Sequence, residues 1–360
     1  MKKIGIITIN DYNNYGNRLQ NYAVQQYIMK YYYDVKTIKN IGYLNKSLSI
    51  KNKLHYLLSR IKTIIIKNER KMCFAKFNEN IEETKKVFYL NGFNNLNEFD
   101  YLIVGSDQVW NPKIGRLTNF DLLSNIDCTN KISFSASFGI SELPEQYKKK
   151  AKDALMQFKE ISVREEAGKK IVEDLTGRKD VEVLVDPTML LTAEEWDNVS
   201  NKPEQLKTDK YILNYFLGEL SEKRKNEIDR IAKENGCKII NMLDSNSPFY
   251  KTGPAEFLYL EKNAFLICTD SFHACVFSIL YNRPFIVFER EDNNVSMNSR
   301  IDTLLNKFHL QDRRYNNKIL QEQLKCDYSN VYEILEEERK RTNEFLNKAL
   351  NVEENKIERK

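Results

Sequence analysis

The sequence predicts an α/β protein made of two facing Rossmann-like domains, each built on a parallel sheet. The chain has 360 residues, and a typical domain takes roughly 150 residues. Apolar runs of strand length alternate with helical segments from one end to the other, as in βαβ units. This alternation is interrupted by a polar stretch, Asn198–Asp209, which contains Pro203. The alternation restarts beyond that stretch. We therefore expect an N-terminal domain over residues 1–197, a C-terminal domain over residues 210–329, and a helix with a charged tail over residues 330–360. In such a fold ligands bind in the cleft, at the carboxyl ends of the strands.

The N-terminal domain begins with an apolar run, Lys3–Ile9, and a segment of helical spacing, Arg18–Tyr32, follows it. Further strands are expected at Asp100–Val104, Lys131–Phe138, Ile161–Val163 and Glu182–Val185. Helices are expected over Tyr147–Phe158 and from Arg164 to Leu175. Strands that alternate with helices of this length indicate a parallel sheet.

The C-terminal domain repeats the same alternation. Strands are expected at Tyr211–Phe216, Lys238–Met242, Ala264–Cys268 and Phe285–Phe288, and helices at Glu222–Asn235, Pro254–Glu261, Ser271–Leu280 and Ser299–Phe308. Gly236 stands where a helix C-cap favours glycine. The last segment, Asn330–Leu350, has a helical period and heavy charge, and we expect it to pack back across a domain.

The charge balance excludes a strongly basic nucleic-acid-binding protein. Lys and Arg total 56 and Asp and Glu total 51, so the net charge is +5 although 30% of the residues are charged. A hydrophobic content of 41% is enough to form cores. With only 12 glycines, the chain has few to spare for glycine-rich phosphate loops, and no P-loop, GxSxG, HExxH or GxGxxG pattern occurs.

The six cysteines are dispersed and form no CxxC pair: Cys73, Cys128, Cys237, Cys268, Cys275 and Cys326. With three histidines besides, we expect free thiols and no metal site. The initial MKKIGIITIN is too short in its apolar part for a signal peptide. No run of about 20 apolar residues occurs, as a spanning helix requires. We expect a cytoplasmic protein.

One segment, residues 46–76, carries many Lys and Arg residues and a single acid, Glu69. Leu54, Leu57, Leu58 and Ile61 give it an apolar stripe, so a basic amphipathic helix is expected. Such a helix can contact the inner face of an anionic membrane peripherally. The favoured interpretation is that its apolar face packs on its own domain while its lysines are solvated.

Two loops of the N-terminal domain carry side chains suited to a sugar. The first has Asn14, Tyr15 and Asn17 just before a helix, whose free amides can hold a polar ligand. The second loop follows a buried strand and has Ser106, Asp107, Gln108 and Trp110. The hydroxyls of a sugar can bond to its amide and acid side chains, and the Trp110 ring can stack on the sugar. The alternative is structural: Asn and Asp act as caps, and Trp110 fills a core.

Two other strand ends carry charge and acid–base chemistry. Arg164 follows a buried strand and needs an anionic partner, either Glu165, Glu166 or Asp186, or a ligand carboxylate or phosphate. In Cys268-Thr269-Asp270-Ser271-Phe272-His273, a strand stops and His273 falls in the first turn of a helix. The positive end of that helix disfavours protonated histidine, which suits a general base.

Taken together, these segments resemble the polysaccharide pyruvyl transferase family. The likeness rests on NYGNRLQNYAVQ, DYLIVGSDQVWNP, SFSASFG, ISVREEAGKKIVEDL, VLVDPTMLL and FLICTDSFHACVFSILYNRPF, which occur in the order of the family between about residues 3 and 290. The resemblance implies a GT-B-like fold, in which two Rossmann-like domains face each other across a central cleft.

Members of the family move an enolpyruvyl group from phosphoenolpyruvate onto two hydroxyls of a sugar, which leaves a ketal and releases phosphate. The resemblance implies His273 as acid and base and Arg164 as a catalytic and donor-binding cation, with Thr269, Ser271 and Arg300 beside the donor. The acceptor, a sugar of a cell-surface polysaccharide or a lipid-linked oligosaccharide, would then meet Asn14, Tyr15, Asn17, Ser106, Asp107, Gln108 and Trp110. No cofactor is implied, because phosphoenolpyruvate is itself the donor.

This chain departs from the family at one position, because many members have arginine where it has Ser271. Arg283, Arg290 or Arg300 can supply the missing charge, or the donor has changed. Two alternatives therefore stay open: a GT-B glycosyltransferase that uses a nucleotide sugar, and a non-catalytic member of a polysaccharide-assembly complex.

Overall fold

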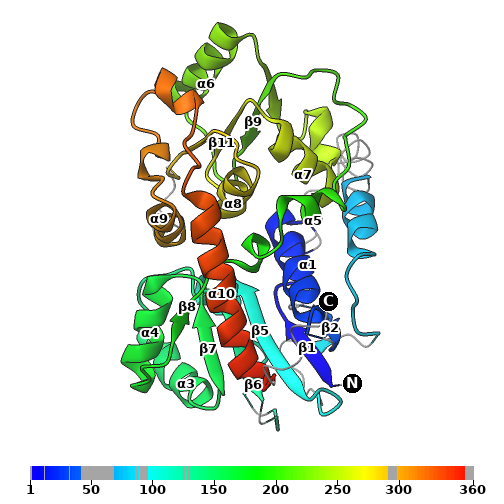
Figure 1. Cartoon of the computed structure of the whole chain (residues 1–360), viewed down its shortest axis with the longest axis vertical. Coiled ribbons are helices and arrows are strands. Elements are labelled where there is room, and N and C mark those ends of the chain that lie inside the picture. The colour runs from blue at the N-terminus through cyan, green and yellow to red at the C-terminus, as the bar shows by residue number, and fades with distance from the viewer. Residues whose placement is uncertain are drawn as a thin grey trace, which may run out of the picture.

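Six parallel strands form the sheet of the N-terminal domain, in the order β2-β1-β5-β6-β7-β8 (Figure 1). Their bounds are β1 Lys3–Ile7, β2 Asp34–Thr37, β5 Tyr101–Asp107, β6 Lys131–Ala136, β7 Glu160–Val163 and β8 Glu182–Val183. This computed structural model describes residues 2–11, 13–31, 33–41, 69–85, 88–89, 96–124, 126–128, 130–290 and 298–352. Every residue of β5 and β6 is buried, because helices cover both faces of a parallel sheet.

Helices α1 Tyr15–Met29, α3 Glu145–Leu155 and α4 Glu166–Thr176 connect these strands. The first begins three residues before the start that its apolar spacing predicts, because the Asn14 side chain accepts a hydrogen bond from the Asn17 amide and caps the helix. A small parallel pair, β3 Asn40–Ile41 with β4 Phe88–Tyr89, lies outside the main sheet and is not predicted from the sequence. Short helices η1 Pro112–Ile114, η2 Pro187–Met189 and α5 Ala193–Asp197 complete this half.

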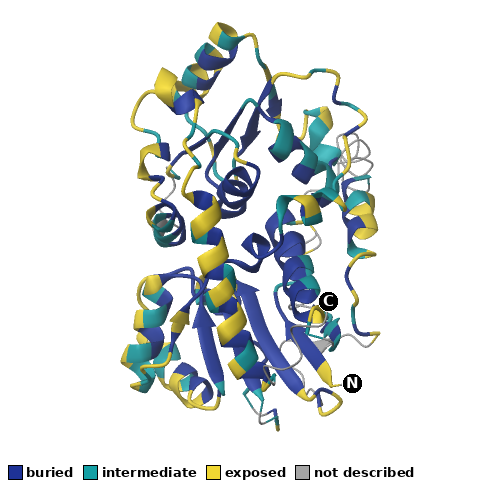
Figure 2. Cartoon of the chain, in the orientation of Figure 1, coloured by how far each residue is buried: buried dark blue, intermediate teal, exposed yellow. Residues whose placement is uncertain are grey.

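The C-terminal domain holds a second parallel sheet of four strands, in the order β10-β9-β11-β12. The strands are β9 Tyr211–Tyr215, β10 Lys238–Asn241, β11 Leu266–Thr269 and β12 Phe285–Val287. The helices are α6 Glu222–Asn235, α7 Pro254–Asn263, α8 Phe272–Leu280 and α9 Asn298–Lys307, with η3 Pro248–Lys251, η5 Gln311–Arg313 and η6 Gln321–Leu324 between elements. Helix α8 is buried along its whole length, as Figure 2 shows in dark blue. Two parallel sheets, each connected by helices, confirm the predicted α/β fold class.

The last helix, α10 Val331–Leu350, runs from the C-terminal domain onto the N-terminal domain (Figure 1). The hydroxyls of Tyr27 and Tyr31 both donate to Asn343, at 2.7 Å. Near its end, the Leu350 carbonyl accepts a hydrogen bond from Tyr101 at 2.9 Å. This helix therefore ties the end of the chain to the first sheet.

The two domains share one apolar core. The largest cluster of buried side chains joins Ile6 and Leu19 of the first domain to Leu213, Phe257 and Phe277 of the second. Tyr15 lies at the junction, stacked on Phe257 at 5.0 Å. Of the basic segment 46–76, residues 69–76 lie in a helix over residues 69–78, and the rest falls outside the described residues.

Candidate functional site

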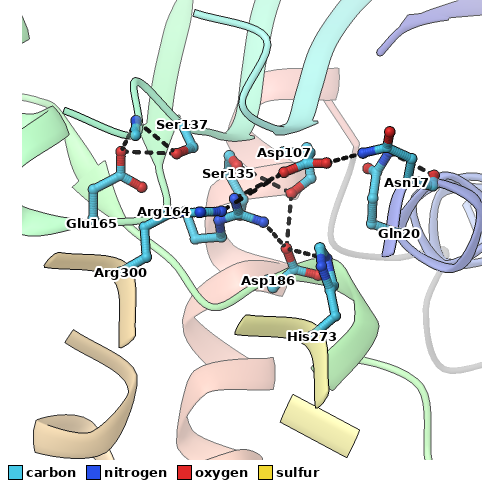
Figure 3. Close-up of polar contacts among 12 residues, drawn as sticks. Asn17, Gln20, Asp107, Ser135, Ser137, Arg164, Glu165, Asp186, His273 and Arg300 are labelled. Carbon is cyan, nitrogen blue, oxygen red and sulfur yellow. Dashed lines mark hydrogen bonds and ion pairs between the residues drawn. The ribbon is translucent and has the colours of Figure 1, made fainter. Parts of the chain in front are cut away.

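Neighbouring strands of the first sheet end side by side and bring polar residues together (Figure 3). Strand β5 ends at Asp107 and Arg164 directly follows β7, with β6 between them. The backbone of Asp107 has a φ of 67°, a left-handed conformation that aspartate tolerates better than most residues. Two helix residues of the second domain, His273 of α8 and Arg300 of α9, meet this edge. We name Asp107, Arg164, Asp186, His273 and Arg300 the interdomain cluster.

Arg164 lies at the centre of the interdomain cluster. Its side chain is 1% exposed and forms ion pairs with Asp107 at 3.1 Å and with Asp186 at 2.5 Å. Of the partners expected from the sequence, Asp186 is therefore used, while Asp107 was not foreseen in this role. Burial alone would lower the pKa of Arg164, but Asp186 and then Asp107 outweigh it and raise that pKa.

Both aspartates are ionised because of these contacts. Burial would raise the pKa of Asp186, but Arg164, then His273, and hydrogen bonds from Thr188 hold it at about 2. The Ser106 hydroxyl also donates to Asp186, at 3.1 Å. The pKa of Asp107 is lowered in the same way, since Arg164, His273 and Arg300 overcome its burial. Asn17 donates a hydrogen bond to the other oxygen of Asp107.

His273 enters the cluster from the first turn of α8, the place predicted from the sequence. Its side chain is 10% exposed, and Nε2 lies 3.8 Å from Asp186 Oδ2. Nε2 has no hydrogen-bond partner among the described residues. Burial lowers the pKa of His273, and the two arginines lower it further, against the opposing effect of Asp186 and Asp107. The imidazole is therefore neutral at pH 7 and able to accept a proton.

Gly16 explains how the histidine fits between the domains. A Cβ atom at Gly16 would stand 2.1 Å from His273 Nδ1, far inside contact distance. Glycine at the start of α1 therefore lets this helix approach the imidazole closely. This requirement could not be predicted from local sequence patterns, because the two residues are far apart along the chain.

Arg300 joins the cluster from α9. Its Nη1 lies 4.0 Å from Asp107 Oδ1, and burial together with repulsion from Arg164 lowers its pKa to about 10. The Phe272 ring lies below both guanidiniums, 4.5 Å from Arg164 and 5.6 Å from Arg300. Arg290 is close enough to oppose the charge of Arg300 as well.

The Thr269 hydroxyl is engaged by two backbone groups, and its expected place beside a donor stays a prediction. Its hydroxyl donates to the Tyr215 carbonyl at 2.6 Å and accepts from the Ser271 amide at 2.9 Å. Ser271 is the N-cap residue of α8 but makes no side-chain capping bond. Asp270 turns away from the cluster to hold the amides of Leu217 and Gly218.

Two residues expected at the acceptor lie in cores instead. Trp110 is fully buried against Phe138, and its Nε1 donates to the Asp121 carbonyl at 3.1 Å, so its ring cannot stack on a sugar. The Tyr15 hydroxyl is likewise buried and donates to the Thr252 carbonyl at 2.9 Å. For Trp110 the structural alternative, a side chain that fills a core, is correct.

Asn17, Ser106 and Asp107 form hydrogen bonds within or to the interdomain cluster, and their contact with an acceptor stays a prediction. Asn14 caps α1 and is half-buried. Gln108 is buried near Gly139, where a Cβ would stand 2.0 Å from its amide nitrogen.

A cavity of about 550 Å³ lies apart from the interdomain cluster, at the carboxyl ends of β9 and β10. Asn214, Asn241, Phe216, Asp229 and Lys225 are among the side chains that line it. The Asn214 side chain donates to Asn241 at 2.9 Å.

Two features are absent from the part of the chain that the structure describes. No group of His, Cys, Asp and Glu side chains is placed to hold a metal ion. No helix has both the length and the apolar character needed to cross a bilayer.

A family model described as "Polysaccharide pyruvyl transferase" matches residues 14–293, which include every residue of the interdomain cluster except Arg300. The chain belongs to the polysaccharide pyruvyl transferase family. The match ends seven residues before Arg300, so this arginine is a feature of the chain that the family match does not cover. A comparison with curated proteins finds no significant match.

Solved structures with a similar backbone trace have low sequence identity to this chain. A UDP-GlcNAc 2-epimerase from Methanocaldococcus jannaschii is 15% identical, with 94% of this chain and 100% of that chain covered and a TM-score of 0.45. A glycosyltransferase from Rickettsia africae ESF-5 is 11% identical, with 98% of this chain and 100% of that chain covered and a TM-score of 0.47. MurG from Acinetobacter baumannii is 10% identical, with 98% of this chain and 95% of that chain covered and a TM-score of 0.40.

Proposed function

We propose that this member of the family transfers a pyruvyl group from phosphoenolpyruvate to two hydroxyls of a sugar and releases phosphate. The observation that carries the proposal is the buried imidazole of His273, whose Nε2 has no hydrogen-bond partner among the described residues and lies 3.8 Å from Asp186 Oδ2. Because burial lowers the pKa of His273, we expect the imidazole to be neutral at pH 7 and to take up a proton. A group of this kind can remove the proton of an attacking hydroxyl, and Asp186 stabilises the imidazolium that results.

The charges of the interdomain cluster assign different roles to its two arginines. The positive charges of Arg164 and Arg300 balance the negative charges of Asp107 and Asp186. Both terminal nitrogens of Arg164 form ion pairs with these carboxylates. Arg164 therefore acts by positioning the two aspartates. Arg300, whose pKa is lowered to about 10 by burial and by Arg164, gains most from a bound anion and would hold the carboxylate or phosphate of the donor.

The nearby Arg290 would add to this attraction, since its charge already acts on Arg300. Arg283 lies at the other end of α8, where its amide bonds to the Ser278 carbonyl. Of the three arginines that the sequence offered in place of the family arginine at Ser271, Arg300 is therefore our choice for the donor site.

The test compares two histidines by the same substitution. His273→Asn should lower phosphate release by about 100-fold or more, as expected for loss of an acid–base residue. His309→Asn is the matched control, because His309 is exposed and has a φ of 57°, which asparagine accommodates. Phosphate release is measured with phosphoenolpyruvate and p-nitrophenyl glycosides of galactose, mannose, glucose and N-acetylglucosamine, each of which offers neighbouring hydroxyls.

Binding of the donor is tested separately from turnover. Arg300→Gln should weaken phosphoenolpyruvate binding about 30-fold, equivalent to ~2 kcal/mol, as measured by calorimetry. Equal turnover in the His273 variant and the wild type contradicts the assigned base, and the absence of any phosphoenolpyruvate binding contradicts the donor.

The cavity in the C-terminal domain favours one second candidate, a glycosyltransferase that takes a nucleotide sugar. Its volume of about 550 Å³ and its carboxamides suit a base and ribose. Asp229 and Asp244 outnumber Lys225 in its lining, however, so it attracts phosphates poorly. A melting shift with UDP or CMP sugars, and none with phosphoenolpyruvate, would establish this function instead.

A further inference from the structure

Ketal formation requires two hydroxyls to lose their protons, and His273 Nε2 offers one acceptor atom. We propose that Glu165 is a second catalytic base, which accepts the proton of the other hydroxyl. This assignment rests on the proposed function, since it names a further residue of the same reaction.

Glu165 is fully buried where β7 passes into α4, directly after Arg164. One carboxylate oxygen, Oε1, accepts three hydrogen bonds from a single loop: the Ser137 hydroxyl at 3.0 Å, the Phe138 amide at 2.9 Å and the Gly139 amide at 3.2 Å. These donors fix the carboxylate and stabilise negative charge on it.

The second oxygen, Oε2, is in the opposite situation. It is buried and has no hydrogen-bond partner among the described residues. In Figure 3 it points away from the loop of Ser137, toward the side where Arg164 and Arg300 lie. A buried carboxylate oxygen without a donor is unfavourable, and the hydroxyl of a bound ligand would supply that donor.

Glu165 and His273 lie on opposite sides of Arg164 in Figure 3 and come from different domains. Each presents one buried proton acceptor without a partner among the described residues. Two such acceptors match a reaction in which two hydroxyls attack the same carbon in turn. If Glu165 served only to hold the loop of Ser137, the hydrogen bonds to its Oε1 would be sufficient.

The proton and bond balance is as follows. The two hydroxyl oxygens each form a bond to C2 of the enolpyruvyl group, and the bond from C2 to the phosphate oxygen breaks. One of the two hydroxyl protons ends on the methylene carbon, which becomes a methyl group, and the other leaves with the phosphate. Glu165 and His273 each take up one proton and pass it on, so both are restored at the end of the cycle.

The decisive variant is Glu165→Gln, because a glutamine oxygen can still accept the three hydrogen bonds from the loop while its NH₂ group replaces Oε2. We expect phosphate release to fall by about 100-fold or more, with the melting temperature and the phosphoenolpyruvate affinity unchanged. Glu166→Gln is the matched control, since the neighbouring side chain is exposed and outside the cluster. Phosphate release is measured with phosphoenolpyruvate and the four p-nitrophenyl glycosides named above.

A second variant covers the outcome that Glu165→Gln does not fold. Glu165→Asp keeps the charge but withdraws both oxygens by one methylene, and it should slow phosphate release without weakening phosphoenolpyruvate binding. Unchanged release in either folded variant overturns the assignment of Glu165 while the proposed function stands. If the wild type itself releases no phosphate with any of the four glycosides, the proposed function fails, and the assignment of Glu165 fails with it.

Discussion

Two regions of the molecule bury a carboxyl group completely, with opposite results for its charge. Asp186 of the interdomain cluster is ionised, with its pKa held at about 2, because Arg164 and His273 outweigh the effect of burial. Glu261, behind α8 in the C-terminal domain, is also fully buried, and burial raises its pKa well above the usual range. Among the described residues its carboxyl group has one hydrogen-bond partner, the Ser278 hydroxyl, which donates at 3.4 Å and is too weak to change that outcome. Partners, rather than depth, decide the charge of a buried acid.

The largest effect should come from removing the cation that makes this difference. Arg164→Met leaves Asp107 and Asp186 buried without their main partner, so we expect a loss of about 3–5 kcal/mol in the free energy of unfolding. Urea denaturation of the variant and the wild type measures it. A loss below about 1 kcal/mol would mean that Arg164 does not hold these charges.

Gly16→Ala should disturb the cluster through packing rather than charge. The new Cβ overlaps His273 Nδ1, and we expect about 1–3 kcal/mol of destabilisation together with a loss of phosphate release as large as in His273→Asn. Gly177→Ala is a control for a glycine in open space, although its φ of 76° adds some strain of its own. Equal phosphate release in Gly16→Ala and the wild type would show that the imidazole position is not critical.

The two acids should also respond to pH with opposite signs. The pKa of Asp186 is lower in the folded state than its ordinary 3.8, so its contribution is present above pH 3.8 and is lost as pH falls toward about 2. This shift corresponds to about 2 kcal/mol. Asp186→Asn should therefore flatten the acid end of the stability curve, as measured by thermal unfolding between pH 2 and pH 5. A curve of unchanged slope there contradicts the lowered pKa.

Glu261 should give the smallest effect at pH 4. Its pKa is raised in the folded state, so its contribution is present below the ordinary value of 4.5 and is lost as pH rises through the folded value. Glu261→Gln keeps the shape of the protonated form and should change stability by less than about 1 kcal/mol at pH 4. At pH 8 the variant should be more stable than the wild type, and denaturation at the two pH values distinguishes these outcomes.

Much of the fold and part of the site could be predicted from the sequence. The alternation of strands and helices predicts both sheets, because apolar runs ending in polar residues are local features. His273 and Arg164 were found for the same reason, since each directly follows a strand. Trp110 and Tyr15 were misplaced, because a ring beside polar residues in the sequence can still turn into a core.

Contacts between distant residues could not be predicted. Asp107 pairs with Arg164 across the end of β6, and Gly16 meets His273 across the two domains. Glu165 was named only as a partner for its neighbour, yet it bonds to the loop after β6. Such pairings depend on strand order and domain contact, and neither is encoded in local spacing.

The core that joins the two domains has a consequence for how the protein unfolds. Tyr15 of α1 packs against Phe257 and Tyr215 of the second domain, and the same apolar cluster continues through α8. Neither half can lose its structure without exposing apolar surface of the other. We expect a single cooperative transition, in which the calorimetric and van 't Hoff enthalpies agree. A truncation that ends within the linker at residues 198–209 should leave the first half unable to fold alone.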